Sequence, residues 1–155
     1  MNDSLEWRRA EEADAPEIRR LTREAYSKWV ARIGREPKPV TADYAQAVRD
    51  HRIDLLYCRG ELAGLIETIP MPDHLLIENV AVAPAFQSRG LGRILMAHAE
   101  AIASSMGFRE IRLYTNHAFD ENVRLYLRLG YRIDHEEELP AGIAVHMTKL
   151  VRKAD

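Results

Sequence analysis

Short hydrophobic runs separated by turn residues predict the strands of this chain. Residues 5–9 are a strand candidate, and residues 55–58 and 62–69 flank a turn at residues 59–61, which is typical of a hairpin. A third run, residues 75–83, is expected beside that hairpin. Further strands are predicted in the C-terminal part of the chain, over residues 111–115, 131–134 and 143–150.

Hydrophobic residues spaced three to four positions apart predict the helices. The first helix starts at a capping-box pattern in residues 14–17 and ends before two prolines in residues 35–40. Thr41 is then expected to cap a short second helix, and residues 89–106 and 122–129 are the third and fourth helices. The apolar stripes of the first and third helices are Ile18, Leu21, Ala25 and Trp29, and Leu91, Ile94, Leu95, Ala99, Ile102 and Met106.

This order of elements predicts an α/β protein with a mixed sheet. The hairpins give antiparallel strand pairs, whereas a helix between two central strands implies a parallel crossover. We expect a single domain over residues 1–155, because a chain of this length buries enough surface to fold alone.

Charge and cysteine content exclude several classes of protein. The chain has 22 Lys and Arg against 24 Asp and Glu, a formal net charge of -2, which lacks the basic excess typical of nucleic-acid binding. No membrane span or secretory signal is predicted from the hydrophobic runs. The single Cys58 excludes internal disulfides and suits a reducing compartment, so we expect a cytoplasmic location. The six histidines lack metal-ligand spacing, and no metal site is predicted.

The most informative segment joins a strand to the long helix. In residues 80–92 a hydrophobic run ends at a proline, and a glycine-bearing turn leads directly into the helix. Unpaired amides and the helix dipole stabilise a phosphate at such a helix start, and Arg89 and Arg93 add positive charge. Neither the P-loop nor the dinucleotide-binding glycine pattern is complete here. Gly90 and Gly92 alone are also compatible with simple tight packing of helix on strand.

Two segments resemble signatures of the GNAT superfamily of acetyl-CoA-dependent N-acetyltransferases. Gln87-Ser-Arg-Gly-Leu-Gly92 matches the Gln/Arg-x-x-Gly-x-Gly/Ala turn of that family, and Leu125-Tyr-Leu-Arg-Leu-Gly-Tyr131 is similar to its later Leu-Tyr-x-x-x-Gly-Phe/Tyr pattern. The expected order of elements also resembles the family over nearly the whole chain. The resemblance implies an α/β fold with a mixed, splayed sheet of six to seven strands flanked by about four helices.

The resemblance further implies that the chain binds acetyl-CoA as its acetyl donor. The turn would hold the pyrophosphate, the preceding strand would pair with the pantetheine arm, and the amide near Val80 would polarise the thioester carbonyl. Asn122, at the expected start of a helix, either contacts the cofactor or caps that helix. The implied cofactor-binding residues are Val80, Ala81, Val82, Gln87, Ser88, Arg89, Gly90, Leu91, Gly92, Arg93 and Asn122.

Tyr126 and Glu78 are the candidate catalytic residues. The resemblance implies Tyr126 as general acid for the departing thiolate, although its apolar neighbours also fit a half-buried packing role. A base is needed because an amine is mostly protonated at neutral pH. Glu78 is the first candidate and Glu67, on the preceding strand, is the second; either glutamate is alternatively an ordinary solvent-facing residue.

The function that the resemblance implies is direct transfer of an acetyl group to a primary amine of a small molecule or peptide. The helices after the first strand usually line the acceptor cleft in this family, so Tyr26 and Tyr44 are candidate substrate-binding residues. A homodimer is compatible with the resemblance, because dimers are common in the family. The alternative function is a noncatalytic acyl-CoA-binding sensor or assembly module, and the sequence does not identify the acceptor.

Overall fold

The computed structural model describes residues 4–140 and 142–152. Within these ranges the strands are β1 (Leu5–Arg9), β2 (Arg52–Cys58), β3 (Glu61–Pro70), β4 (Leu75–Val82), β5 (Glu110–Asn116), β6 (Arg132–Leu139) and β7 (Gly142–Leu150). The helices in the same ranges are α1 (Ala15–Ile33), α2 (Lys38–Thr41), α3 (Tyr44–Asp50), α4 (Leu91–Ser105) and α5 (Asp120–Arg128). Single 3-10 turns cover Glu12–Asp14 and Pro84–Phe86.

The strands form one mixed sheet in the order β1-β2-β3-β4-β5-β7-β6, which confirms the predicted fold class. β4 and β5 are parallel, and their register covers Leu75–Ile77 opposite Ile111–Leu113. The pairs β1–β2, β2–β3, β5–β7 and β6–β7 are antiparallel. No helix of the described chain combines the length and the hydropathy that a membrane crossing requires.

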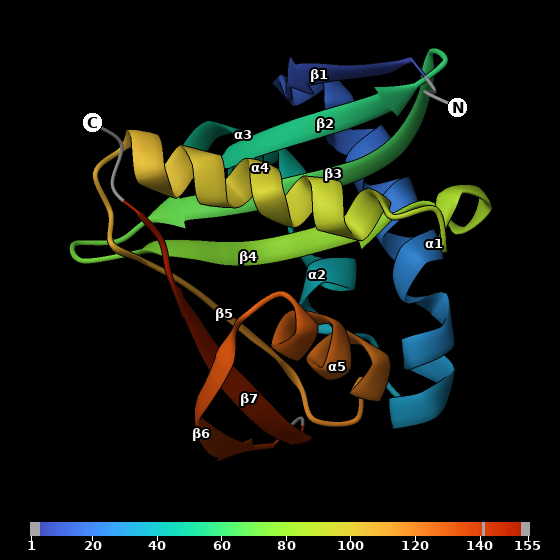
Figure 1. The fold of residues 1–155 in the computed structure, drawn as a ribbon. Helices are drawn as coiled ribbons and strands as arrows, with labels where there is room; N and C mark the ends of the chain where they lie inside the picture. The colour runs from blue at the N-terminus through green and yellow to red at the C-terminus, as the bar shows by residue number, and fades with distance from the viewer. Residues whose placement is uncertain (1–3, 141, 153–155) are drawn as a thin grey trace. The chain divides into compact units, whose positions relative to one another are not determined.

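Contacts between residues divide the chain into two compact units, whose helices and strands are labelled in Figure 1. The first unit comprises Met1–Thr68 and Asn79–Ala97, and the second comprises Ile69–Glu78 and His98–Asp155. Both β4 and α4 contribute residues to each unit. The expectation of one domain over residues 1–155 stays a prediction.

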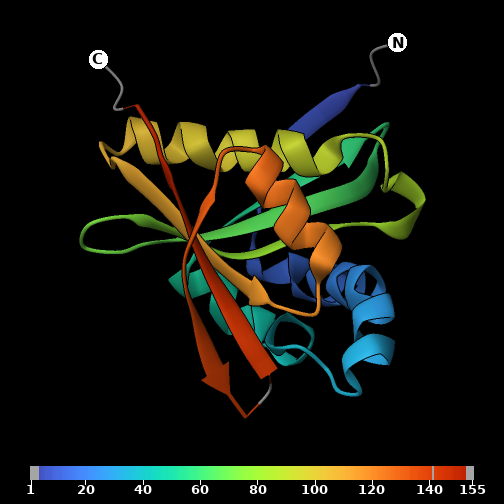
Figure 2. The ribbon, with the colours of Figure 1, turned by 60° about the horizontal axis from the view of Figure 1, so that its bottom comes forward.

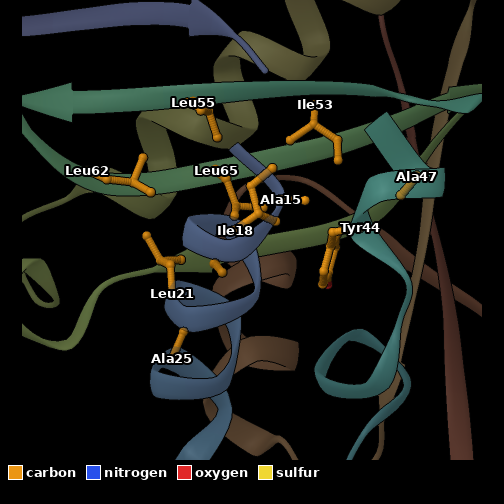
Figure 3. Close-up of a cluster of buried hydrophobic side chains, with 11 residues drawn as sticks. Ala15, Ile18, Leu21, Ala25, Tyr44, Ala47, Ile53, Leu55, Leu62 and Leu65 are labelled. Atoms are coloured by element: carbon orange, nitrogen blue, oxygen red, sulfur yellow. The ribbon is translucent and has the colours of Figure 1, made fainter. Parts of the chain in front are cut away.

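The core of the first unit lies between α1, α3 and the strands β2 and β3 (Figure 3). Ile18 and Leu21 of α1 are at most 1% exposed, and they pack in one cluster with Leu55, Leu65 and Tyr44. Each buried side chain of this size contributes about 1.5–3 kcal/mol to folding relative to an exposed one. The predicted stripe of the first helix is therefore confirmed.

The second unit contains the antiparallel strands β5, β7 and β6 together with α5 (Figure 2). β7 lies between its two neighbours, and its register pairs Tyr114 with His146 on one side and His135 with His146 on the other. Ile111, Leu113 and Met147 are buried on one face of these strands. β6 is an edge strand of eight exposed residues, longer than the four residues predicted for it.

The predicted helix start at Asp14 is confirmed, because Asp14 is the N-cap residue of α1, but its side chain makes no capping hydrogen bond, and the predicted cap at Thr41 is wrong. The carboxylate of Asp14 instead accepts hydrogen bonds from Arg8 at 2.8 Å and from the amide of Glu11 at 2.8 Å, and it accepts none from the first amides of α1. Thr41 ends α2, and the side chain of Asp43 caps α3 by accepting from the amide of Gln46 at 3.1 Å. The sequence pattern identifies residues that are able to cap a helix. Whether their side chains form the capping hydrogen bond depends on tertiary neighbours such as Arg8 and on the short extra helix α2.

The predicted stripe of the long helix is partly wrong. Ile94 and Met106 are 36% and 50% exposed, whereas Met96 and Ala103 are buried. α4 ends at Ser105, so Met106 lies beyond its last turn. The buried face of α4 therefore includes Met96 and Ala103 and leaves Ile94 at its edge.

Candidate functional site

The turn between β4 and α4 contains two residues in a left-handed conformation, separated by Arg89. Ser88 has φ 65° and Gly90 has φ 81°, and α4 begins at the next residue, Leu91. The amides of the first helical turn have no acceptor within their own helix and carry the positive end of its dipole. Backbone amides in such an arrangement form a concave site for an anion.

Two side chains fix this turn from within the first unit. Gln87 donates from Nε2 to the carbonyl of Val82 at 3.1 Å, which ties the turn to the end of β4. The guanidinium of Arg89 lies 5.5 Å from the ring centre of Phe86. Both Arg89 and Arg93 are exposed, so their charges add to the field at the helix start. Phosphate contacts of the Gln87 and Arg89 side chains stay predictions.

The last residues of β4 alternate between half-buried and buried positions. Val80 and Val82 are half-buried, whereas Ala81 is 3% exposed and belongs to the core cluster of the first unit. The amide of Ala83 donates to the carbonyl of Ala63 at 2.8 Å, which pairs this end of β4 with β3. Any ligand contact of Ala81 therefore involves its backbone, since its side chain is occupied by packing.

A buried polar network that the sequence analysis missed surrounds Asn79 on β4. Its side-chain oxygen accepts from the hydroxyl of Tyr26 at 3.0 Å, and its Nδ2 donates to the hydroxyl of Tyr44 at 3.2 Å. Nδ2 also lies 3.5 Å from the hydroxyl of Thr22. A lone asparagine between hydrophobic strand residues is the one sequence signal that indicates such a network, because a buried amide needs partners.

The two candidate substrate-binding tyrosines belong to this network. Tyr44 is 0% exposed, and its hydroxyl donates to the carbonyl of Pro39 at 2.5 Å. Tyr26 is half-buried, with its hydroxyl on Asn79. Both residues thus hold the wall of the first unit in place, and their contact with an acceptor stays a prediction.

The second candidate base, Glu67, is also buried in the first unit. It is 4% exposed, and its carboxylate pairs with Nδ1 of His51 at 2.6 Å. His51 follows the end of α3, and its side chain is 29% exposed. A carboxylate held against an imidazole is a common arrangement for orienting the ring. The solvent-facing alternative for Glu67 is wrong.

The first candidate base, Glu78, lies in the second unit. Its Oε1 accepts a hydrogen bond from the hydroxyl of Tyr114, on β5, at 3.2 Å. Glu78 is half-buried and Tyr114 is 37% exposed. The carboxylate is thus held by a neighbouring strand and remains within reach of solvent.

The motif around Tyr126 is a helix C-terminus of the Schellman type. Gly130 has φ 99°, its amide donates to Leu127 at 3.1 Å, and the amide of Tyr131 donates to the carbonyl of Tyr126 at 3.0 Å. This pattern requires a residue that tolerates positive φ, which explains the glycine of the motif. The hydrophobic contact that accompanies the pattern joins the rings of Tyr126 and Tyr131, whose centres are 6.1 Å apart.

Tyr126 differs from the other tyrosines in its hydroxyl. Its ring is 6% exposed, and within residues 4–140 and 142–152 its hydroxyl forms no hydrogen bond. Burial raises the pKa of Tyr126 to about 12, so the group keeps its proton at neutral pH. The five remaining tyrosines all have hydroxyl hydrogen bonds: Tyr26, Tyr44, Tyr57, Tyr114 and Tyr131.

Asn122 is the third residue of α5, because the N-cap position is Phe119. The capping interpretation of Asn122 is therefore wrong. In the turn before this helix, the side-chain oxygen of Asn116 accepts a hydrogen bond from the amide of Ala118 at 2.8 Å. Contact of Asn122 with the cofactor stays a prediction.

The described part of the chain contains no group of three or more His, Cys, Asp or Glu side chains that could hold a metal ion.

The mixed sheet, the turn that opens α4 and the tyrosine motif that ends α5 together define an α/β protein with the GNAT fold. Residues 15–131 match the acetyltransferase (GNAT) family, and the chain belongs to that family. The structure of PaiA N-acetyltransferase from Thermoplasma acidophilum in complex with coenzyme A is similar, with a TM-score of 0.79 and 18% sequence identity. That similarity covers 95% of this chain and 99% of the other.

Two curated proteins are similar in sequence over part of their length. N-alpha-acetyltransferase 80 of Mus musculus is 38% identical over 71 residues, which are 46% of this chain and 21% of the mouse protein. Streptothricin acetyltransferase of Streptomyces lavendulae is 31% identical over 74 residues, which are 46% of this chain and 39% of that protein. The matches thus span well under half the length of these relatives.

Proposed function

We propose that this protein binds acetyl-CoA and transfers its acetyl group directly to a primary amine of a small molecule or peptide. Family membership supports acetyl transfer, and the similar PaiA structure contains coenzyme A. The observation that carries the proposal is the turn from Gln87 to Arg93, in which left-handed residues lead into the unpaired amides of α4.

The residues of this turn fit a pyrophosphate. A Cβ added at Gly90 would meet no atom within 4 Å, so space is open beside the backbone there. The amides of Leu91, Gly92 and Arg93 are the first three of α4, and the guanidinium groups of Arg89 and Arg93 supply charge for two phosphates. Val80 and Val82 contribute backbone groups for the pantetheine arm, and the Val80 amide polarises the thioester carbonyl.

The proposed chemistry uses one base and one acid. Bound acetyl-CoA supplies the acetyl group as a thioester. Glu78 accepts a proton from the acceptor ammonium, directly or through one water, so that the nitrogen has a lone pair for attack on the carbonyl carbon. Tyr126 donates its hydroxyl proton to the departing sulfur as the carbon–sulfur bond breaks and the carbon–nitrogen bond forms, and the second proton that the nitrogen loses to become an amide returns through water to the Tyr126 oxygen. No covalent bond to the protein forms in this sequence of steps.

Tyr126 supports the enzyme over a noncatalytic sensor. An acid must carry its proton at working pH and have a hydroxyl that is not already donating elsewhere. The raised pKa of about 12 and the uncommitted hydroxyl within the described residues meet both conditions. A protein that only senses acyl-CoA needs neither.

The acceptor class follows from the relatives as a proposal. Their names include an N-alpha-acetyltransferase and a streptothricin acetyltransferase, so amines of peptides and of small molecules are both candidates. Tyr26 and Tyr44 contribute to the acceptor wall mainly by fixing its shape.

We also propose a reducing, cytoplasmic location, since Cys58 is free and buried. We further propose a homodimer, which sedimentation would reveal.

A two-part experiment tests this function. Calorimetry with CoA is expected to give one site per chain, and an amine library that includes peptides, polyamines and antibiotics is expected to release free thiol from acetyl-CoA. Tight binding with a flat amine screen would favour the sensor. Absence of binding would reject both functions.

A further inference from the structure

Four titratable side chains form a row across neighbouring strands of the second unit. Glu78 lies on β4, Tyr114 on β5, His146 on β7 and His135 on β6. Tyr114 and His146 are direct partners in the β5–β7 register, and His146 and His135 are partners in the β6–β7 register. The residues that immediately precede Glu78 and Tyr114 are partners in the parallel β4–β5 register. Side chains in register on one face lie about 5 Å apart, so each contacts the next.

The contacts along this row hold the ring of Tyr114 between two groups. Its hydroxyl donates to Oε1 of Glu78 at 3.2 Å, and its ring centre lies 5.7 Å from that of His146 at an angle of 34°. The ring of His146 is stacked on that of His135, with centres 4.3 Å apart and planes 8° apart. The Nε2 of His146 also pairs with the carboxylate of Glu137 at 3.0 Å. His146 is therefore fixed on two sides and supports the ring of Tyr114.

We propose that Tyr114 is a positioning residue that orients the Glu78 carboxylate toward the acceptor amine, and that His146 fixes Tyr114 for this role. The proposal rests on the proposed function and identifies how its base is held. A glutamate side chain has several rotatable bonds, and an unrestrained carboxylate loses conformational entropy when it must meet a substrate. A hydrogen bond from a ring that is itself packed removes part of this cost before the substrate arrives.

Arg112, two residues before Tyr114 on β5, does not hold the Glu78 carboxylate in place of Tyr114. Arg112 donates to Glu110 at 2.7 Å and lies 3.7 Å from Asp73, so its charge is already shared by two carboxylates. On β6, the carboxylate of Asp134 accepts hydrogen bonds from Thr148 and Arg132. These neighbouring charges are paired among themselves, whereas the phenol of Tyr114 donates its hydrogen bond to Glu78.

A double-mutant cycle with Tyr114→Phe and Glu78→Gln tests the proposal. With the best amine from the screen, Tyr114→Phe is expected to lower kcat by about tenfold, a loss equal to about 1.4 kcal/mol, with the KM for acetyl-CoA and the Tm unchanged. In the Glu78→Gln background the same substitution is expected to change kcat by less than about twofold. Tyr57→Phe is the matched control, because its hydroxyl contacts Arg8 in the other unit, and it is expected to retain wild-type kinetics.

A second readout does not depend on turnover. In protein labelled with carboxyl-13C glutamate and free of acetyl-CoA, the resonance absent from Glu78→Gln is assigned to Glu78. That resonance is expected to shift in Tyr114→Phe and to stay in place in Tyr57→Phe. An unmoved resonance, or equal kcat losses from Tyr114→Phe with and without Glu78, would overturn the proposal. A wild-type protein that acetylates no amine would instead reject the proposed function itself, and this inference with it.

Discussion

The hydroxyl of Tyr26, on α1, donates a hydrogen bond to the side-chain oxygen of Asn79, on β4, at 3.0 Å. The other end of the same amide reaches the hydroxyl of Tyr44, on α3, at 3.2 Å. One buried amide thus ties two helices to the strand, directly before Val80. Because Asn79 is 3% exposed, water cannot replace these partners without a rearrangement of the core.

Asn79→Ala is expected to destabilise the protein by about 2–3 kcal/mol, because the hydroxyls of Tyr26 and Tyr44 lose a buried partner. Urea unfolding followed by circular dichroism measures the change. Gln46→Ala, which removes an amide from the exposed face of α3, is the control and should stay within about 0.5 kcal/mol of wild type. An Asn79→Ala protein as stable as that control would contradict the role of the network.

Tyr126→Phe is expected to lower kcat by about 100-fold, in the range that general acid catalysis contributes, while CoA affinity changes little. The substitution removes one hydroxyl without a hydrogen bond in the described chain and keeps the ring contact with Tyr131. Thiol release gives kcat, and calorimetry gives the affinity. Unchanged turnover would reject Tyr126 as the acid.

Gly90→Ala and Gly90→Glu form a matched pair for the turn. Both side chains are strained at φ 81°, at a cost of about 1–2 kcal/mol, and neither Cβ meets an atom within 4 Å. Only glutamate places a negative charge beside the proposed pyrophosphate. Calorimetry with CoA should therefore show at least tenfold weaker binding for Gly90→Glu than for Gly90→Ala. Equal CoA affinities of the two variants would show that the pyrophosphate does not bind at this turn.

Stability at alkaline pH is expected to depend on Tyr126. Burial raises its pKa from about 10 to about 12 in the folded protein, so the unfolded chain loses this proton first as the pH rises. The stabilising contribution is complete below pH 10 and is lost progressively up to about pH 12, and at pH 11 it has fallen by about 1 kcal/mol.

Thermal unfolding at pH 8 and pH 11 measures this effect. Tyr126→Phe should lose less stability between these two values than wild type, by about 1 kcal/mol. Tyr131→Phe should likewise lose less stability than wild type between pH 8 and pH 11, since burial and the charge of Glu100 also raise the pKa of Tyr131. Identical pH dependence in all three proteins would show that neither hydroxyl is desolvated.

Periodicity was sufficient to predict most elements of the fold. The stripe of α1 and the hairpin of β2 and β3 follow from spacing and from the turn at Arg59 and Gly60, which have φ 52° and 79°. The start of α1 after Asp14 was predictable, but the start of α3 was not, because Thr41 ends the short helix α2 and Asp43 caps α3. The buried face of α4 also depends on which neighbours it packs against, and this shifts Ile94 to the surface.

The sequence by itself determined the local features of the site: the glycine turn before α4, the Schellman glycine after Tyr126 and the family to which the chain belongs. These features act within a few residues, so their spacing is enough to specify them. Only the tertiary structure decided that Glu78 meets Tyr114, that Glu67 meets His51, and that Asn79 joins Tyr26 to Tyr44. The partners in these pairs are 16 to 53 positions apart in the chain, and they meet only because strand register and helix packing bring distant side chains together.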